Sequence, residues 1–337
     1  MQYTILGKTG LKAALVSFGG IPIQRADAAN TKAVVDKLEE YGINYIDTAR
    51  SYTVSEEYLG QALEGRRENF ILATKSMSRD SASMQKDIET SLTNLRTDFI
   101  DLYQLHNPGE KDIDQVFAPG GAWEALDEAR KAGKIRHIGV TAHSLDVLRR
   151  LIDEFSNKIE TVMFPYNIVE LQGRELLALA KEKGLGTIAM KPLAGGNLED
   201  WRLALRFVAL SGVCDISIPG MGSPEEVDRN ASAAGDLSPL TEDELAQCEA
   251  IRKELGEHFC RRCGYCAPCF NGIDIPGSFL MANYLRRYGL SEWAKARYKA
   301  MPFHASSCSM CGACEKRCPY HLPIRQMLRQ VEKDFGY

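Results

Sequence analysis

Eight of the ten cysteines in this 337-residue chain fall in two short runs near its C-terminal end, and their spacing restricts that part of the chain more than any other feature. The first run places a cysteine at every third position: Cys260, Cys263, Cys266 and Cys269. The second run is Cys308, Cys311, Cys314 and Cys318, with Pro319 directly after it. With this spacing one loop binds three corners of an iron–sulfur cube, and the fourth cysteine reaches the neighbouring cluster.

The two runs therefore predict two [4Fe–4S] clusters. The first cluster is expected on Cys260, Cys263, Cys266 and Cys318, and the second on Cys308, Cys311, Cys314 and Cys269. Two zinc sites and a disulfide framework are the alternatives. Zinc needs only paired Cys-x2-Cys units, so the third evenly spaced cysteine of each run and the terminal Cys-Pro favour clusters.

Length and composition indicate one large and one small domain. The chain is 45% hydrophobic and 26% charged, which is enough to bury a large core. We expect one domain at residues 1–256 and a second at 257–337, with Gly256 at the boundary. No export signal is visible at the start and no apolar run is long enough to span a membrane. Together with reduced thiolates, this predicts a cytoplasmic protein.

Charge is distributed unevenly between these domains. Residues 257–337 hold twelve lysines and arginines against six acidic residues, whereas the whole chain has a net charge of −4. A basic surface beside clusters is suited to steering an acidic electron carrier, although such charge is also common on a solvated face. The acidic character of the rest of the chain argues against a nucleic-acid partner.

Residues 1–256 alternate short β-rich runs with helical stretches, which is typical of βαβ units. Eight such units at this length predict a (β/α)8 TIM barrel. A doubly wound sheet is the alternative, but no Gly-x-Gly-x-x-Gly follows the first strand. The expected strands are residues 14–18, 44–47, 70–75, 99–106, 135–141, 161–166, 186–191 and 215–218.

Two helix starts are marked by capping residues. Ser223, Pro224 and Glu226 follow the eighth expected strand in the pattern of a capped helix whose glutamate turns back to the cap. Thr241 and Glu244 open a further helix in the same way.

Four side chains are expected at the barrel mouth, where the carboxyl ends of the strands meet. Asp47, Lys75 and His106 stand at strand ends, and Tyr52 lies five residues beyond Asp47. A phenol is a poor proton donor near neutral pH, but a neighbouring ammonium favours the phenolate. An aspartate would hold that lysine, and a histidine would polarise a carbonyl oxygen. Each residue alone has a structural explanation; their combination favours a carbonyl reductase site.

The chain resembles the aldo–keto reductase family over most of residues 1–256, and then the subgroup that carries a C-terminal ferredoxin-like, two-cluster domain. The motifs are 6–10, Phe18-Gly19-Gly20, 45–49 with Tyr52, Ala73-Thr74-Lys75, Leu105-His106, 133–140, 266–269, 272–276 and 318–320. The resemblance implies a (β/α)8 barrel followed by a small α-rich domain, a nicotinamide cofactor, and Asp47, Tyr52, Lys75 and His106 as the catalytic tetrad.

The resemblance also assigns cofactor contacts, with departures. Met163 and Met190 stand where the family has a glutamine and an aromatic residue at the nicotinamide. Gly220 and Glu226 stand where a lysine and an arginine grip the NADP 2′-phosphate. The NADP grip is therefore not evident, and NAD(P) is expected without a choice between the two. The other expected contacts are Gly20, Thr141, Lys191, Gly195, Ser223 and Asn230.

A hydride carries two electrons, while a cluster takes one at a time, so three functions follow. The chain is a carbonyl reductase whose clusters transfer electrons or dock a partner such as a ferredoxin or flavodoxin-like carrier. Alternatively, a flavin at the mouth couples hydride and cluster chemistry, an idea motivated by Met163 and Met190. In the third, the chain is a non-catalytic electron-transfer protein, which the complete tetrad disfavours.

Overall fold

The computed structural model describes residues 1–287 and 290–337. The chain forms two compact units, Met1–Leu193 with Asp200–Leu240, and Ala194–Glu199 with Thr241–Tyr337. We call them the barrel unit and the C-terminal unit and describe each by itself. The division after residue 256 stays a prediction.

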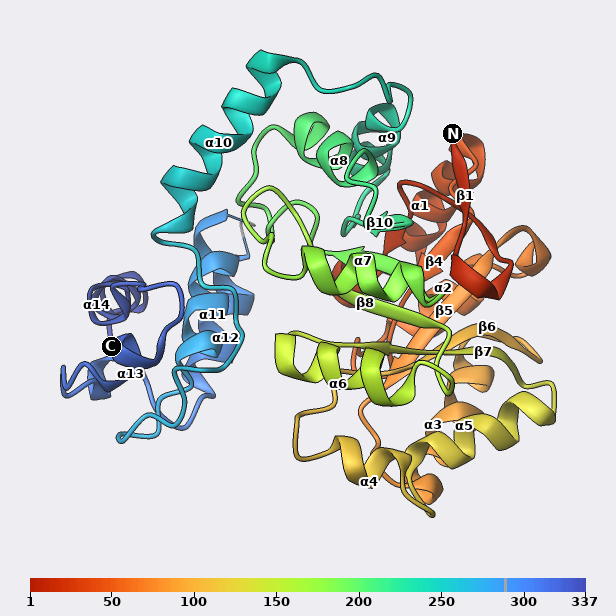
Figure 1. Ribbon diagram of the computed structural model, residues 1–337, viewed down its shortest axis with the longest axis horizontal. Helices are drawn as coiled ribbons and strands as arrows, with labels where there is room; N and C mark the ends of the chain where they lie inside the picture. Colours follow the sequence, from red (N-terminus) through yellow and green to blue (C-terminus); the bar gives the residue numbers. More distant parts are fainter. Residues whose placement is uncertain (288–289) are drawn as a thin grey trace. The chain divides into compact units, whose positions relative to one another are not determined.

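An eight-stranded parallel sheet forms the barrel unit, with its strands in the order of the chain. Parallel bridges from Val16 to Ser217 and from Gly19 to Gly220 join the last strand to the first. The predicted (β/α)8 barrel is confirmed (Figure 1). Its strands are β3 (Phe18–Gly19), β4 (Tyr45–Asp47), β5 (Ile71–Ser76), β6 (Ile100–Leu105), β7 (Ile135–Thr141), β8 (Thr161–Pro165), β9 (Gly186–Met190) and β10 (Ile216–Ile218).

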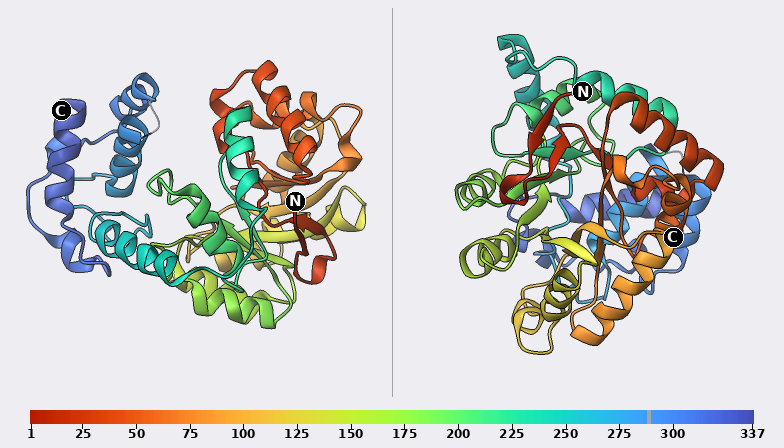
Figure 2. Two further views of the ribbon diagram at one scale, coloured as in Figure 1. Left: turned by 90° about the horizontal axis from the view of Figure 1, so that it is seen from above. Right: turned by 90° about the vertical axis from the view of Figure 1, so that its right-hand side faces the viewer.

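Helices lie around the outside of these strands and bury their apolar faces against them (Figure 2). They are α1 (Ala28–Tyr41), α2 (Ser55–Ala62), α3 (Ser81–Asn94), α4 (Ile113–Phe117), α5 (Ala122–Lys131), α6 (Leu145–Phe155), α7 (Arg174–Glu182), α8 (Trp201–Ala209) and α9 (Pro224–Ala233), with 3-10 turns at Gly7–Thr9, Ile21–Arg25 and Arg67–Asn69. This alternation places every strand's carboxyl end at one mouth.

The first expected strand, residues 14–18, differs from the structure. Residues Lys12–Ala14 form β2, which pairs antiparallel with β1 (Tyr3–Ile5) in a separate hairpin, and the barrel strand is the short β3. Leu6 and Ala13 of this hairpin are fully buried in the same interior cluster as Leu102. The apolar residues expected to form one strand therefore belong to two successive elements, the hairpin strand β2 and the barrel strand β3.

The two helix caps form, one of them with a shift. Thr241 and Glu244 make a full capping box at α10 (Glu242–Gly256). Ser223 caps α9 by accepting a bond from the Glu226 amide, as predicted. The Glu226 carboxylate, however, accepts from the amide of Gly222 at 2.5 Å, one residue before the cap.

The C-terminal unit is helical, as predicted. Beyond α10 it holds α11 (Ile275–Arg287), α12 (Ser291–Lys299), α13 (Ala313–Arg317) and α14 (Ile324–Phe335), with a 3-10 turn at Ala305–Ser307. Its core joins apolar residues such as Phe279, Tyr298 and Leu328 to Cys266, Cys314 and Cys318. Over the described residues, no helix combines the length and apolarity that crossing a bilayer requires.

Close packing of α2 against the end of α3 depends on Gly60. A Cβ at this position would lie 2.2 Å from the carbonyl oxygen of Asn94 and 2.8 Å from backbone atoms of Leu95. Because these neighbours are backbone, we expect Gly60→Ala to lower the free energy of unfolding of the barrel unit by about 1–3 kcal/mol. Chemical denaturation followed by circular dichroism measures the change.

Gly235→Ala is the matched control, since its Cβ would meet only Ser232 O at 3.5 Å, an ordinary contact. Equal midpoints for the two variants would contradict this account of the α2–α3 packing.

Candidate functional site

Three side chains converge at the mouth because adjacent strands end together. Asp47 is the last residue of β4, Lys75 lies near the end of β5, and His106 follows β6. Lys75 is in register with Gln104 of β6, two residues before His106. Parallel pairing therefore brings to one edge residues that are far apart in the sequence.

Asp47 and Lys75 form a buried ion pair. The Lys75 Nζ donates to Asp47 Oδ2 at 2.5 Å and to the backbone oxygen of Thr48 at 2.7 Å, and both charged residues are 2% exposed. Burial raises the pKa of Asp47 and lowers the pKa of Lys75, and the contact between them opposes both changes. The Gln104 amide also donates to Asp47 Oδ1 at 3.3 Å.

Tyr52 lies beside both this pair and His106. The Lys75 Nζ is 5.1 Å from the centre of the Tyr52 ring. The Tyr52 and His106 rings meet edge to face, with centroids 6.1 Å apart. All four residues of the predicted tetrad therefore lie together, and their catalytic roles stay a prediction.

His106 is held as a neutral imidazole. Burial, followed by the charges of Lys75 and Arg79, lowers its pKa to about 3. Arg79 donates to the backbone oxygen of His106 at 3.0 Å and pairs with Asp112. Among the described residues, the His106 Nδ1 is buried with no hydrogen-bond partner.

A second buried carboxylate, which the sequence analysis did not identify, supports the site through its contacts with the elements that carry it. Glu56 of α2 is 1% exposed, and it accepts from Thr74 and from Ser91 at 2.8 Å each. It also pairs with Arg50, and its charge acts on Lys75. Gln104 carried one usable signal, a polar residue within the mostly apolar run of β6, which indicates burial but names no partner; Glu56, between Ser55 and Glu57, carried none.

The expected cofactor residues differ in their surroundings. Asn230 of α9 is fully buried, and neither polar atom of its amide has a partner among the described residues. Thr141 Oγ1 accepts from the Asn107 amide at 2.9 Å. Met163 packs in the apolar barrel interior and Met190 packs against it. Of Asn230, Thr141, Met163 and Met190, only Asn230 has buried side-chain polar atoms without a partner among the described residues.

Several positions expected to contact the cofactor take part in close packing or side-chain contacts within the protein. Lys191, with φ of 55°, contacts His143 Nδ1 through its ammonium at 3.1 Å. A Cβ at Gly20 would meet the backbone oxygen of Asp47 at 2.5 Å, and one at Gly220 would meet Pro22 at 3.1 Å. Gly195, at φ of 63°, belongs to the C-terminal unit and is not placed relative to the barrel.

Cysteines of the second run and Cys269 line one cavity in the C-terminal unit, as the predicted second cluster requires. Its walls include Cys269, Cys308, Cys311 and Cys314. No three ligand side chains among the described residues surround one point as the ligands of a single metal ion do. A cube differs because its four thiolates bind separate irons.

Cysteines of the first predicted cluster are also neighbours. Burial, together with the charges of Cys263 and Cys318, raises the pKa of Cys260 to about 11. Burial likewise raises the pKa of Cys266 to about 12, with contributions from Cys260 and Cys263. Thiols held protonated in this way become thiolates when iron binds, so the residues fit clusters.

Comparison with known proteins gives two family matches. The model of the "Aldo/keto reductase family" matches residues 15–203, and that of the "4Fe-4S dicluster domain" matches residues 259–323. L-galactose dehydrogenase of Arabidopsis thaliana is 28% identical over 74% of this chain and 94% of its own length. Methylglyoxal reductase DkgA of Yersinia pestis is 35% identical over 53% of this chain and 63% of its own length.

A solved structure agrees with the first of these matches. The holo form of aldo-keto reductase AKR11C1 from Bacillus halodurans superimposes with a TM-score of 0.66 at 27% identity. The superposition covers 74% of this chain and 96% of that structure.

We expect His106 to stay neutral from pH 8 down to about pH 4, because its pKa is lowered to about 3 from the ordinary 6.5. The imidazole carbon resonance, assigned by comparison with His106→Gln, should show no titration in this range. A midpoint near 6.5 would contradict the prediction.

The same shift affects stability. Since the folded pKa lies below the unfolded one, the contribution of His106 is present above pH 6.5 and is lost as the pH falls toward about 3. Between pH 7 and 5 the wild type should lose about 2 kcal/mol more unfolding free energy than His106→Gln.

For the cysteines, we expect Cys269→Ala to remove the cluster of the second run and Cys266→Ala that of the first, because each deprives one cube of a ligand. Each variant should hold about half the iron of the wild type and lose a different cluster signal in anaerobic electron paramagnetic resonance. Cys248→Ala, a buried thiol outside the runs, is the control. Loss of the first-run signal in Cys269→Ala, with the second retained, would reverse the assignment.

Proposed function

Because the chain belongs to the aldo/keto reductase family and is an oxidoreductase with a 4Fe-4S dicluster domain, we propose that it reduces an aldehyde or ketone at the barrel mouth. One observation carries this proposal: the buried Lys75 ammonium and the His106 ring both lie against the ring of Tyr52. The small-molecule carbonyl is the proposed substrate.

Tyr52 is the proposed proton donor. The Lys75 ammonium, 5.1 Å from the ring centre, favours the phenolate that remains after the proton has moved to the carbonyl oxygen. Asp47 fixes that ammonium at 2.5 Å. A positioned general acid of this kind contributes about 10²–10⁴-fold to the rate.

His106 orients the carbonyl in this proposal. A neutral imidazole donates one hydrogen bond and carries no charge that would compete with Lys75. The pKa of about 3 keeps it in this form at physiological pH. Its buried position supports a fixed direction for that bond.

The barrel residues fit a nicotinamide dinucleotide, which supplies hydride to the carbonyl carbon when bound. The unpartnered amide of buried Asn230 suits the base at the far end of such a cofactor. The Ser223-capped start of α9 presents backbone amides suited to phosphate oxygens. Positions 220 and 226 hold no cation, and the Glu226 carboxylate would repel a 2′-phosphate. We therefore propose NAD(P) binding without a dedicated 2′-phosphate grip.

The eight clustered cysteines are the proposed ligands of two [4Fe–4S] groups. Clusters exchange single electrons, so the natural partner is a one-electron carrier of the ferredoxin or flavodoxin type. A cytoplasmic location is part of this proposal, because exposed clusters need reducing surroundings.

Flavin is the second candidate cofactor. The side chain of Met163 has no amide group that could hold a nicotinamide carboxamide, and this favours flavin. Against it, Met163 packs in the apolar barrel interior, a usual role for this flexible side chain. Flavin fluorescence after denaturation of an anaerobic preparation separates the two. The non-catalytic alternative has no support, since the chain is an oxidoreductase by family.

We expect Tyr52→Phe to lower kcat/KM for carbonyl reduction by about 10²–10⁴-fold, because only the donated proton is lost. Methylglyoxal and L-galactose, named for two relatives, are the first substrates to assay, in the reducing and oxidising directions. Cluster absorption should be unchanged.

Tyr58→Phe, which removes a hydroxyl from the half-buried tyrosine of α2, is the control. Turnover by Tyr52→Phe equal to that of this control would remove the tyrosine from the mechanism.

A further inference from the structure

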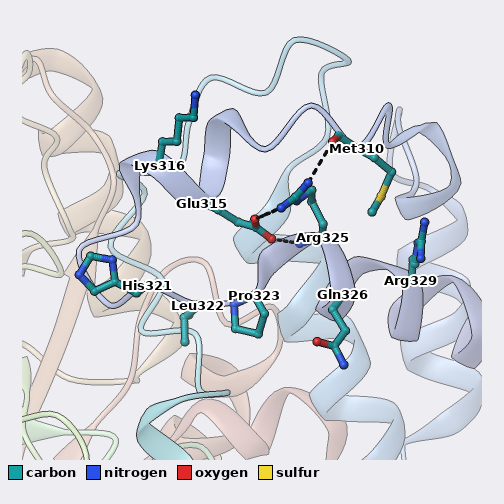
Figure 3. A pocket seen from close by; sticks show the side chains of 9 residues that line it. All are labelled: Met310, Glu315, Lys316, His321, Leu322, Pro323, Arg325, Gln326 and Arg329. Atoms are coloured by element: carbon teal, nitrogen blue, oxygen red, sulfur yellow. Dashed lines mark hydrogen bonds and ion pairs between the residues drawn. The ribbon is translucent and has the colours of Figure 1, made fainter.

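An open groove of about 620 Å³ lies between α13, the following turn and α14 in the C-terminal unit (Figure 3). Its lining holds three cations, Lys316, Arg325 and Arg329, together with the imidazole of His321. The one carboxylate in the lining, Glu315, is bound by Arg325. We call this feature the basic groove.

Two of its cations have no carboxylate partner. Lys316 and Arg329 are exposed, and in the described ranges 1–287 and 290–337 neither makes an ion pair. They therefore present charge to solvent, where it attracts anionic surfaces over about one Debye length, ~8–10 Å at physiological salt.

Arg325 links the groove to the predicted second cluster. Its guanidinium pairs with Glu315 at 2.7 Å, and the side chain lines both the groove and the cavity of Cys269, Cys308, Cys311 and Cys314. Glu315 and then the charges of Cys314 and Cys308 raise the pKa of Arg325. At this point the side chain of Arg325 alone separates the basic groove from the cysteine cavity.

The cysteine cavity also reaches the surface. Cys311 is exposed, and Phe270, which follows Cys269 and lines the cavity, is 78% exposed. Phe270 and Arg325 line the same cavity, and aromatic and arginine side chains are enriched in docking surfaces. A carrier that docks beside Cys311 would therefore lie next to a predicted cluster ligand.

We propose that the basic groove docks an acidic one-electron carrier of the flavodoxin type, which reduces the cluster on Cys308, Cys311, Cys314 and Cys269. The proposal rests on the proposed function only through the presence of that cluster. Charge complementarity selects the partner: a carrier with acidic groups around its redox centre would place them over Lys316 and Arg329.

The transfer is balanced without a further reactant. The anionic flavin hydroquinone of the carrier gives one electron and becomes the neutral semiquinone. The cluster takes that electron and passes from the 2+ to the 1+ state, and no proton or bond is exchanged.

Stopped-flow mixing of the full-length holoprotein with reduced acidic flavodoxin tests the proposal. The test variant is Lys316→Glu/Arg329→Glu. The control is Lys295→Glu/Lys299→Glu on α12, which makes the same change in net charge outside the groove. Formation of the semiquinone, followed in its long-wavelength band, gives the second-order rate constant.

At low ionic strength the groove variant should react at least ~10-fold more slowly than the wild type, while the control changes by less than ~3-fold. The difference should shrink at high salt, where surface charges are screened. Dithionite should reduce the clusters of all three proteins equally, which shows that the variants are intact.

Equal rate constants for the groove and control variants would overturn the proposal, because net charge alone would then explain them. An unchanged rate in the groove variant would overturn it as well. Wild-type protein without a chromophore that dithionite bleaches would remove the cluster premise. Failure of the tetrad is detected separately, by the Tyr52→Phe assay.

Discussion

The buried contact between Lys75 and Asp47 is the interaction on which the barrel site depends. Two charges removed from water are costly unless they are paired and hydrogen-bonded. Here the ammonium also donates to Thr48 O, and the carboxylate also accepts from Gln104. The partners come from β4, the loop after it, β5 and β6, so the pair exists only because these parallel strands end at one edge. Fold and site therefore follow from the same constraint.

A second constraint is the number of electrons that each part of the chain handles. In the proposed function, hydride chemistry at the barrel mouth would move electrons in pairs, while the predicted clusters would move them singly. A molecule that accepts or supplies single electrons would then be the partner of the predicted clusters. This is the reason that a surface beside Cys308 and Cys311 matters, since an exposed cluster edge is useful only when a carrier can reach it.

The sequence predicted the barrel and the strand ends that carry Asp47, Lys75 and His106 well, because strand ends in a parallel barrel are marked by local patterns. Asp47, Lys75 and His106 each close an apolar run, and the closure of the barrel brings them together. The start of the barrel was predicted less well, since residues 12–19 serve a hairpin and then a two-residue strand, and only Ser17 interrupts the apolar run between them.

Local sequence patterns did not predict which groups form hydrogen bonds with one another. The bond from Gly222 to Glu226 replaced the expected capping box because the carboxylate reached an amide one residue earlier. The support that Glu56 gives to the site, through Thr74 of β5 and Ser91 of α3, depends on tertiary packing alone. The cysteine spacing likewise predicted ligands, but the cations that line the neighbouring groove come from the way in which α13 and α14 pack.

Buried polar atoms separate structural residues from candidate ligand contacts in this molecule, although only in combination with position. Most buried polar groups in native proteins are paired, and Glu56 follows that rule fully. His106 Nδ1 and both polar atoms of Asn230 do not. Tyr45 Oη and Thr161 Oγ1, within the strands, also lack partners over the described residues, so an unpaired atom alone identifies no site. His106 and Asn230 differ because one stands at a strand's carboxyl end and the other on the helix that follows β10. In a (β/α)8 barrel the carboxyl ends of the strands and the loops after them form the active-site face, so in the proposed function an unpaired imidazole at such a strand end, or an amide on the helix that follows, is a candidate to bind the substrate or the cofactor.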